Sequence, residues 1–364
     1  FANDAISDAD SSPGKITFAT SDADDAGTPT VAMTIDDSQN VTFVNDIILP
    51  AGKSIMLDGN VHTYIYESAD NVIAFVAGAS SALKIDANSR ISLSNNDSGT
   101  SNTIFGKNAG LSLDDGSNYN VFIGEDVSNA AMVDATWNVG VGYNVLGALT
   151  TGDFNTCVGG QAGLNITDGT HNTFLGQAAG EISTSITYAV GVGVGALGGA
   201  NATADAIGTV AVGYQSLTAL TTGAGNVAVG YQSLDSETAG DGNTAIGYTA
   251  LSAQNDGDLN TAVGYEAGLS HTTGASGWGG NTFIGGMAGK YNGAGRGNTF
   301  VGAEAAAGVS SPVLTGNYNS AFGVQSGVAL QGAAHENTFF GAYAGDVLET
   351  GSDNTCIGTQ ADTD

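Results

Sequence analysis

A short repeat runs through most of this chain and limits its fold more than any other feature. The stretch "NVAVGYQSL" at 226–234 follows "TVAVGYQSL" at 209–217 and precedes "NTAIGYTAL" at 243–251. The template N-T-x-h-G-x-x-A, in which h is apolar, finds fifteen copies, most of them 17 or 18 residues apart. The longer intervals are 20 residues (189 to 209) and 21 residues (260 to 281 and 298 to 319). A repeated unit indicates a function distributed along the chain, whereas an enzyme has its catalytic residues together at one site.

A repeat of this length with a strand-like core predicts an all-β fold, the parallel β-solenoid or β-roll, with one coil per repeat. β-branched residues and glycine dominate the unit and no 3.6-residue periodicity is present, which argues against the longer helical repeats. We expect residues 101–364 to form about fifteen coils, ~4.8 Å apart, in a rod ~70 Å long. Each coil has a strand of about four residues. The fourth position is always a large apolar residue, and we expect this column to point inward.

Three other positions of the repeat keep one character. The fifth is always glycine, which predicts a positive φ or an approach to the next coil that is too close for a Cβ. The eighth is Ala, Ser or Val, because the next segment must pack closely against the strand. The first is usually asparagine, whose amide can bond the next asparagine and the backbone in a ladder along the rod. Ala189 and Thr209 interrupt that ladder, which predicts a local irregularity between them.

The glycines of the fifth position are Gly106, Gly124, Gly142, Gly159, Gly176, Gly193, Gly213, Gly230, Gly247, Gly264, Gly285, Gly302, Gly323, Gly341 and Gly358. The asparagines of the expected ladder are Asn102, Asn120, Asn138, Asn155, Asn172, Asn226, Asn243, Asn260, Asn281, Asn298, Asn319, Asn337 and Asn354.

Charge argues against several classes of partner. The 364 residues include 7 Lys and Arg against 36 Asp and Glu, for a net charge of −29. Nucleic-acid binding needs clustered Lys and Arg on phosphates, and an anionic membrane surface is disfavoured for the same reason. No apolar run of about 18 residues predicts a bilayer span. Strong acidity suits a molecule outside a cell or particle in salty water, so we expect an extracellular location.

The unit N-T-A-I-G-Y-x-A-L followed by T-T-G resembles two groups of repeat proteins. It is similar to the β-roll repeats in the heads of trimeric autotransporter adhesins, which read roughly S-V-A-I-G-x-x-S-x-A. It looks closer to the N-T-A-V-G-Y-Q-A-L…T-T-G arrays of bacteriophage tail fibres and related surface proteins. The likeness covers about 102–362 and implies an elongated homotrimer that presents a binding surface away from a cell or particle. The chain stops inside a repeat, so we expect a further C-terminal part.

Residues 1–100 have a different pattern. We expect an all-β segment with coils of another length, acting as a connector or as a cap over the first coil, because a bare solenoid end exposes unpaired strand edges. The passage "TPTVAMTIDDSQNVTF" is similar to a stretch that precedes the repeats in many phage and phage-like fibres, with Gln39 where glycine is usual. Strand-like stretches alternate with turn signals at 15–20, 31–36, 40–44, 54–58, 62–66, 71–77, 82–86 and 90–94.

Candidates for chemistry are few. A metal site needs ligands that converge, whereas the histidines fall far apart in the register, so we expect them on turns or facing solvent: His62, His171, His271 and His335. "GVGVGALGG" at 191–199 lies inside the repeat and opens no helix, which argues against a dinucleotide site. Two acidic clusters offer oxygen ligands for Ca²⁺, although solvated turns also explain them: Asp22, Asp24 and Asp25, and Asp256 and Asp258. We expect neither an enzyme nor a cofactor.

The two cysteines, Cys157 and Cys356, both occupy the third position, eleven coils apart. That separation is ~53 Å in a straight rod, far beyond the reach of a disulfide. We therefore expect free thiols that act as small apolar fillers. Because third and fourth positions face opposite sides of a strand, one lines the coil interior and the other a second apolar face. A homotrimer would bury that second face.

Two of the longer intervals place extra residues outside the coil, at 270–281 with Trp278 and at 308–319 with Tyr318. Insertions into solenoids emerge as loops, and loops carry recognition. An exposed tryptophan with tyrosine neighbours suits sugar stacking. The alternative is that Trp278 covers the seam between chains of a trimer.

Three functions follow from these features. The first is a structural fibre of a phage or phage-like particle at the virion surface, whose partners are its own copies and a host-surface glycan or protein. The second is a bacterial cell-surface adhesin or extracellular filament subunit, favoured by the adhesin likeness and the acidic surface. The third is a polysaccharide-degrading tailspike, which needs a carboxylate pair in a groove.

Overall fold

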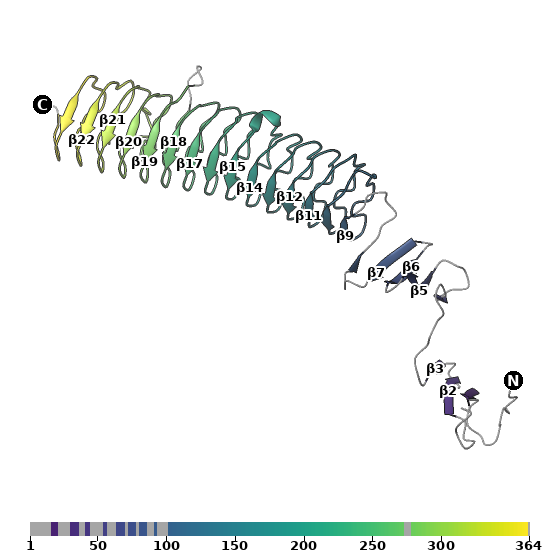
Figure 1. The fold of residues 1–364 in the computed structure, drawn as a ribbon. Helices are drawn as coiled ribbons and strands as arrows, with labels where there is room; N and C mark the ends of the chain where they lie inside the picture. Colours follow the sequence, from purple (N-terminus) through teal and green to yellow (C-terminus); the bar gives the residue numbers. More distant parts are fainter. Residues whose placement is uncertain are drawn as a thin grey trace. The chain divides into compact units, whose positions relative to one another are not determined.

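A computed structural model describes residues 16–20, 30–35, 41–43, 54–56, 63–69, 72–77, 80–85, 91–92, 101–272 and 278–362 (Figure 1). The chain divides into two compact units, Phe1–Ser92 and Leu93–Asp364. Each unit has its own sheets.

The N-terminal unit holds two antiparallel sheets, each with its strands in chain order. All eight predicted strand-like stretches contain a strand, but the expectation of coils is wrong, because neighbouring strands run antiparallel. The first sheet comprises β1 (Ile16–Thr20), β2 (Thr30–Ile35) and β3 (Val41–Phe43). The second comprises β4 (Ser54–Met56), β5 (Thr63–Ala69), β6 (Val72–Ala77), β7 (Ser80–Ile85) and β8 (Ile91–Ser92).

The C-terminal unit is a parallel β-solenoid, as the repeat predicts. Its single sheet has 15 strands in chain order (Figure 1), each contributed by one repeat and each three residues long rather than four. Neighbouring strands pair residue for residue, as in Val227↔Thr244 and Ala228↔Ala245. The strands are β9 (Thr103–Phe105), β10 (Val121–Ile123), β11 (Val139–Val141), β12 (Thr156–Val158), β13 (Thr173–Leu175), β14 (Val190–Val192), β15 (Val210–Val212), β16 (Val227–Val229), β17 (Thr244–Ile246), β18 (Thr261–Val263), β19 (Thr282–Ile284), β20 (Thr299–Val301), β21 (Ser320–Phe322), β22 (Thr338–Phe340) and β23 (Thr355–Ile357).

The glycine that follows every strand meets both conditions named above. Its φ lies between 126° and 145° in all fifteen copies, a region that L side chains avoid. The next coil also approaches too closely for a side chain: a Cβ added at Gly230 would lie 2.2 Å from the carbonyl oxygen of Gly247. Glycine therefore permits both the turn out of the strand and the tight stacking of coils.

The strand faces are opposite to the expectation for the fourth position. The third position points into the coil and is buried throughout, for example at Phe174 and Ala228. The fourth position points outward: Phe105 is 62% exposed and Ile357 is 71% exposed. The prediction of an inward fourth column is therefore wrong. The physical reason is that coils this small are filled by one strand residue together with side chains from the rest of the coil.

The main filler from the rest of the coil is the ninth position, which varies inversely in size with the third. Where the third residue is large, as at Phe174, the ninth is Gly180, and a Cβ there would lie 2.6 Å from the ring. Where the third residue is Ala211, the ninth is Leu217, and both are fully buried. Some small pairs are filled from the next coil, since a Cβ at Gly268 would lie 2.6 Å from Phe283. The interior thus keeps a nearly constant volume, as close packing requires.

The expected irregularity between positions 189 and 209 is present. A 3₁₀ helix, η1 (Ala204–Ala206), occupies this longer interval and is the one helical element of the described residues. The sheet continues through it in register, with Val190 paired to Val210.

Candidate interaction surface

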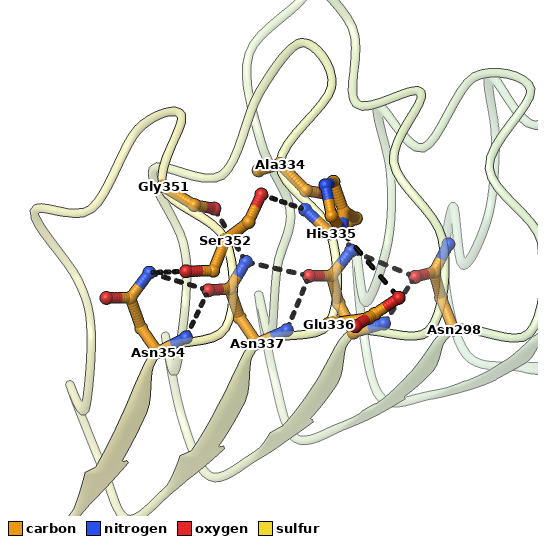
Figure 2. A network of polar contacts seen from close by, with 9 residues as sticks. Asn298, Ala334, His335, Glu336, Asn337, Gly351, Ser352 and Asn354 are labelled. Carbon is orange, nitrogen blue, oxygen red and sulfur yellow. Dashed lines mark hydrogen bonds and ion pairs between the residues drawn. The ribbon is translucent and has the colours of Figure 1, made fainter.

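The first-position asparagines form a hydrogen-bonded column inside the rod. Asn337 shows the pattern (Figure 2): its Nδ2 donates to Oδ1 of Asn319 at 3.0 Å and to the carbonyl oxygen of Gly351 at 2.8 Å. Its own Oδ1 accepts from the backbone N–H of Asn354 at 3.0 Å. Most amides of the column thus join a coil to the coil before it and also hold the far side of their own coil, whereas Nδ2 of Asn260 is buried without a hydrogen-bond partner.

The column has two runs. The first extends from Asn102 to Asn172 and ends where the backbone N–H of Ala189 donates to Oδ1 of Asn172 at 3.0 Å. The second extends from Asn226 to Asn354. Between them Thr209 holds only the far-side contact, a 3.5 Å bond to Gly223. Nearly all of these asparagines are buried, so the column supports the rod and offers nothing to a ligand.

A second interior column contains an unexpected polar segment. Four consecutive coils place fully or almost fully buried polar residues at the twelfth position, where six other coils have Leu or Ile: Glu237, Gln254, His271 and Asn292. Oε1 of Glu237 accepts from the backbone N–H of Gly240 at 2.6 Å, and its Oε2 accepts from Nε2 of Gln254 at 2.8 Å. The column stabilises its own members and does not open to the surface.

His271 corrects the expectation that all four histidines lie on turns or face solvent. Its ring is 1% exposed. Nδ1 lies 2.8 Å from the carbonyl oxygen of Gly293 and donates to it, which leaves Nε2 to accept from Asn281 at 3.3 Å. Burial lowers the pKa of His271 to about 4, so the ring is neutral at ordinary pH. Aligning the repeats at the twelfth position of each coil would have shown this polar segment in the sequence.

The outward face of the long sheet carries no charge; its fourth-position column is apolar, and its second-position column is mostly threonine. Positions two and four point outward from each strand, and they hold Thr, Val or Ser and Val, Ile, Leu or Phe respectively. None of the fifteen strands contains a charged residue. In a chain with 43 charged side chains (7 + 36), this face is set apart from the rest of the surface.

One lateral edge of this face is an aromatic column. The residue just before each coil's first position, which we call the leading column, has a left-handed φ of 56° to 72° in every coil. Five successive members nevertheless carry rings, with centroid separations of 4.5, 6.4, 4.8 and 4.8 Å: Tyr119, Trp137, Phe154, His171 and Tyr188. All five are exposed. Non-glycine residues are uncommon at such φ values, so exposed rings there require a reason.

The opposite edge carries a second aromatic column farther along the rod. The sixth position of each coil follows the invariant glycine, and we call these residues the trailing column. Four successive members are tyrosines, stacked with centroids 5.2, 5.1 and 5.4 Å apart: Tyr214, Tyr231, Tyr248 and Tyr265. Each is 41–52% exposed.

The two candidate binding residues from the insertions both lie at the leading edge. Trp278 is 44% exposed, and a Cβ added at Gly280 of the leading column would lie 2.9 Å from its ring. Tyr318 belongs to the leading column and its ring covers Gly297, at 2.8 Å from a Cβ there. The insertion at 308–319 is exposed at 309–312, but Leu314 returns to the core and bridges Asn292 and Gly332.

The remaining predicted residues lie apart from one another. Cys157 and Cys356 are free and buried, as predicted, and burial raises the pKa of both thiols. In the part of the chain that the structure describes, no three His, Cys, Asp or Glu side chains are grouped as metal ligands. His62 and the acidic cluster Asp22, Asp24 and Asp25 lie outside the described residues. Asp258 accepts the backbone N–H of Asp241 at 2.9 Å.

Comparisons with known proteins do not assign this chain to a family, so its function has to be inferred from its own residues. No family model, curated protein or solved structure matches this chain. Across the described ranges, no helix has both the length and the apolar character needed to cross a membrane.

Proposed function

We propose that the chain is the structural subunit of an elongated homotrimeric fibre that presents a receptor-binding surface outside a cell or particle. The observation that carries the proposal is the uncharged face of the fifteen-stranded sheet, with its continuous apolar fourth-position column. Soluble monomers rarely expose contiguous apolar patches of more than a few hundred Å², and larger patches mark interaction sites. Depletion of charge is also typical of the core of an interface.

Copies of the same chain are the partner that fits this face best. The face repeats one composition from β9 to β23, so its partner must be equally long and equally regular. A rotation axis parallel to the rod gives every copy such a partner. Three copies around the axis would turn positions two and four inward, and none of these residues is charged.

The biological setting is inferred from the repeat itself. The likeness to tail-fibre arrays favours a fibre of a phage or phage-like particle, with residues 1–100 as its connector or cap. A bacterial adhesin or filament subunit is the second candidate, favoured by the adhesin-like unit and by the net charge of −29. In both settings the receptor is a host-surface glycan or protein, contacted by side chains of the rod that lie outside the trimer interface. The proposal assigns the rod no catalytic role.

A matched pair of lysine substitutions tests the assembly. Val229 faces outward on β16, whereas Ala239 is exposed on another side of the same coil. Val229→Lys should convert the trimer to monomers in sedimentation velocity, because three buried lysines would meet near one axis. Ala239→Lys should remain trimeric. If both variants behave alike, the sheet face is not the interface.

Receptor binding is tested separately with labelled trimer on an array of bacterial surface glycans and on intact cells. Binding that requires the assembled rod, and that is lost with the monomeric Val229→Lys chain, supports the fibre role. A trimer that binds no glycan and no cell surface contradicts the receptor-binding part and leaves the assembly standing.

A further inference from the structure

From the fourth coil to the ninth, the two lateral edges of the sheet face have reciprocal sizes, whereas the third and tenth coils carry large residues on both edges (Trp137 with Tyr143, and Leu259 with Tyr265). From the fourth coil to the sixth, the leading residues are Phe154, His171 and Tyr188, and the trailing residues are Gly160, Gln177 and Val194. From the seventh coil to the ninth the order reverses: the leading residues are Gly208, Gly225 and Gly242, and the trailing residues are Tyr214, Tyr231 and Tyr248. The edges lie on opposite ends of three-residue strands, so this match is not needed for packing within one chain.

Four edge glycines with open space around them also lie in coils whose opposite edge carries an aromatic ring. A Cβ added at Gly208 or Gly225 would meet no atom within 4 Å, and both glycines are exposed. Gly160 and Gly286 of the trailing column have the same open space. Each of these four glycines belongs to a coil whose opposite edge carries a ring: Phe154 opposite Gly160, Tyr214 opposite Gly208, Tyr231 opposite Gly225, and Trp278 opposite Gly286. A fifth such glycine, Gly332, lies outside both columns.

The leading aromatic stack therefore ends at a notch. Tyr188 stacks on His171 at 4.8 Å, but the next two members of the column are Gly208 and Gly225. These glycines continue the same edge, since the backbone N–H of Gly225 donates to the carbonyl oxygen of Ile207 at 2.9 Å. The notch closes at Gly242, where a Cβ would lie 3.0 Å from the side chain of Leu259.

We propose that Tyr214 and Tyr231 of one copy insert over Gly208 and Gly225 of the next copy and extend its aromatic stack beyond Tyr188. This inference rests on the proposed assembly and adds its register: the copies are parallel, with equal coils side by side. Rotation about an axis parallel to the rod brings the trailing edge of each copy to the leading edge of its neighbour at the same level.

A shifted register would lose this fit. Displacement by one coil in one direction would set Tyr214 against Tyr188, and in the other direction it would set Val194 against Gly208 and leave that glycine without a ring. Size matching therefore selects one arrangement from many that the uniform sheet face alone would allow, as specificity requires.

The test exchanges the sizes across the seam. Gly225→Tyr blocks the notch, and Tyr231→Gly removes the ring that fills it. We expect each single variant to weaken trimer association by about tenfold or more, because three equal seams change at once. The double variant Gly225→Tyr/Tyr231→Gly should recover most of the affinity. Tyr188 shows that the leading column accepts tyrosine at a φ of 56°, so Gly225→Tyr need not disturb the coil.

Two control variants separate the seam from the coil. Gly332→Tyr adds a ring at another open, left-handed glycine, and Tyr343→Gly removes an exposed tyrosine at a left-handed position outside both columns. Both should leave the association constant unchanged in sedimentation equilibrium. If the chain forms trimers but neither seam variant weakens them, or the double variant is no better than the singles, the register is overturned while the assembly stands. If the unmodified chain is monomeric, both proposals fall.

Discussion

The Nδ2 group of Asn155 donates to Oδ1 of Asn138, one coil earlier, at 3.0 Å, and both side chains are fully buried. The same bond recurs at seven other members of the column: Asn138, Asn172, Asn243, Asn281, Asn319, Asn337 and Asn354. Buried amides have no water to replace a lost partner, so each bond has a high cost of removal.

Removing one member of the column should destabilise its own coil and both neighbours. In Asn243→Ala, Oδ1 of Asn226 loses one of its two donors, the backbone N–H of Asn260 loses its acceptor, and the carbonyl oxygen of Gly257 loses one of its two donors. We expect a loss of about 3 kcal/mol in the free energy of unfolding, with faster hydrogen exchange confined to these coils. Asn255→Ala removes an exposed amide at a residue without a left-handed φ and should change stability by less than about 0.5 kcal/mol. Equal effects of the two variants would contradict a structural role for the column.

The inverse sizes of the third and ninth positions predict a rescue. Phe174→Ala should cost about 3–5 kcal/mol through the cavity it leaves, and Gly180→Leu alone should overpack the same coil. The double variant reproduces the Ala211 and Leu217 pair of another coil, and it should recover most of the stability. Leu217 has a φ of 49° at the ninth position, so leucine is compatible with that backbone. Thermal unfolding of the three variants decides; a double variant less stable than Phe174→Ala would contradict the account.

Two glycines of one coil should differ sharply in tolerance to alanine. Gly230 has a φ of 141° and no room for a Cβ, so Gly230→Ala should cost several kcal/mol and separate two coils. Gly225 has a φ of 67° and open space, so Gly225→Ala should cost only about 1 kcal/mol. Urea unfolding of both variants measures the difference. Comparable losses would show that stacking does not depend on the invariant glycine.

Acid should weaken the rod through His271. Its pKa is lowered from 6.5 to about 4 by burial, so the unfolded chain binds this proton more readily between those values. The stability that it contributes is therefore complete above pH ~6.5 and is lost as the pH falls to ~4, by about 3 kcal/mol. His271→Gln, which copies Gln254 of the same column, should lose less stability than the unmodified protein over this interval. Parallel pH profiles of the melting temperature would contradict the prediction.

A substitution of Trp278 distinguishes the two roles considered for it, glycan recognition and burial at the seam between chains. Because Gly286 offers open space at the same level, Trp278→Ala should weaken trimer association and leave glycan binding by the remaining trimers unchanged. Sedimentation equilibrium and the glycan array measure the two effects on the same samples. If Trp278→Ala abolishes glycan binding and leaves trimer association unchanged, Trp278 is a glycan-binding residue. The pairing of Trp278 with Gly286 would then not be part of the seam.

The sequence was sufficient for the parallel solenoid because its strand, glycine and asparagine positions recur in fifteen aligned copies. It misled on which strand face is inside. The fourth position is uniformly large and apolar, like a core, whereas the true interior mixes Phe174, Cys157 and Ala211. That mixture is possible because the ninth residue compensates for the third, a correlation that single columns do not show. The uniform fourth-position column faces outward instead, where it suits the proposed contact with an equally regular neighbouring chain.

The residues on the two edges of the sheet face were the hardest part of the surface to predict from the sequence. Tyr188 and Tyr214 belong to different columns six residues apart in the repeat register, and only the fold places them on opposite edges of one face. His271 was missed for a related reason, since burial depends on the far side of the coil, where no fixed residue type marks the register.

The mass of the intact chain in solution tests the central claim most directly. Sedimentation equilibrium at micromolar concentration should give three times the chain mass of 36.0 kDa, with no change as salt is raised, because the proposed interface is uncharged. A single-chain mass under the same conditions, with the solenoid folded, would contradict the account.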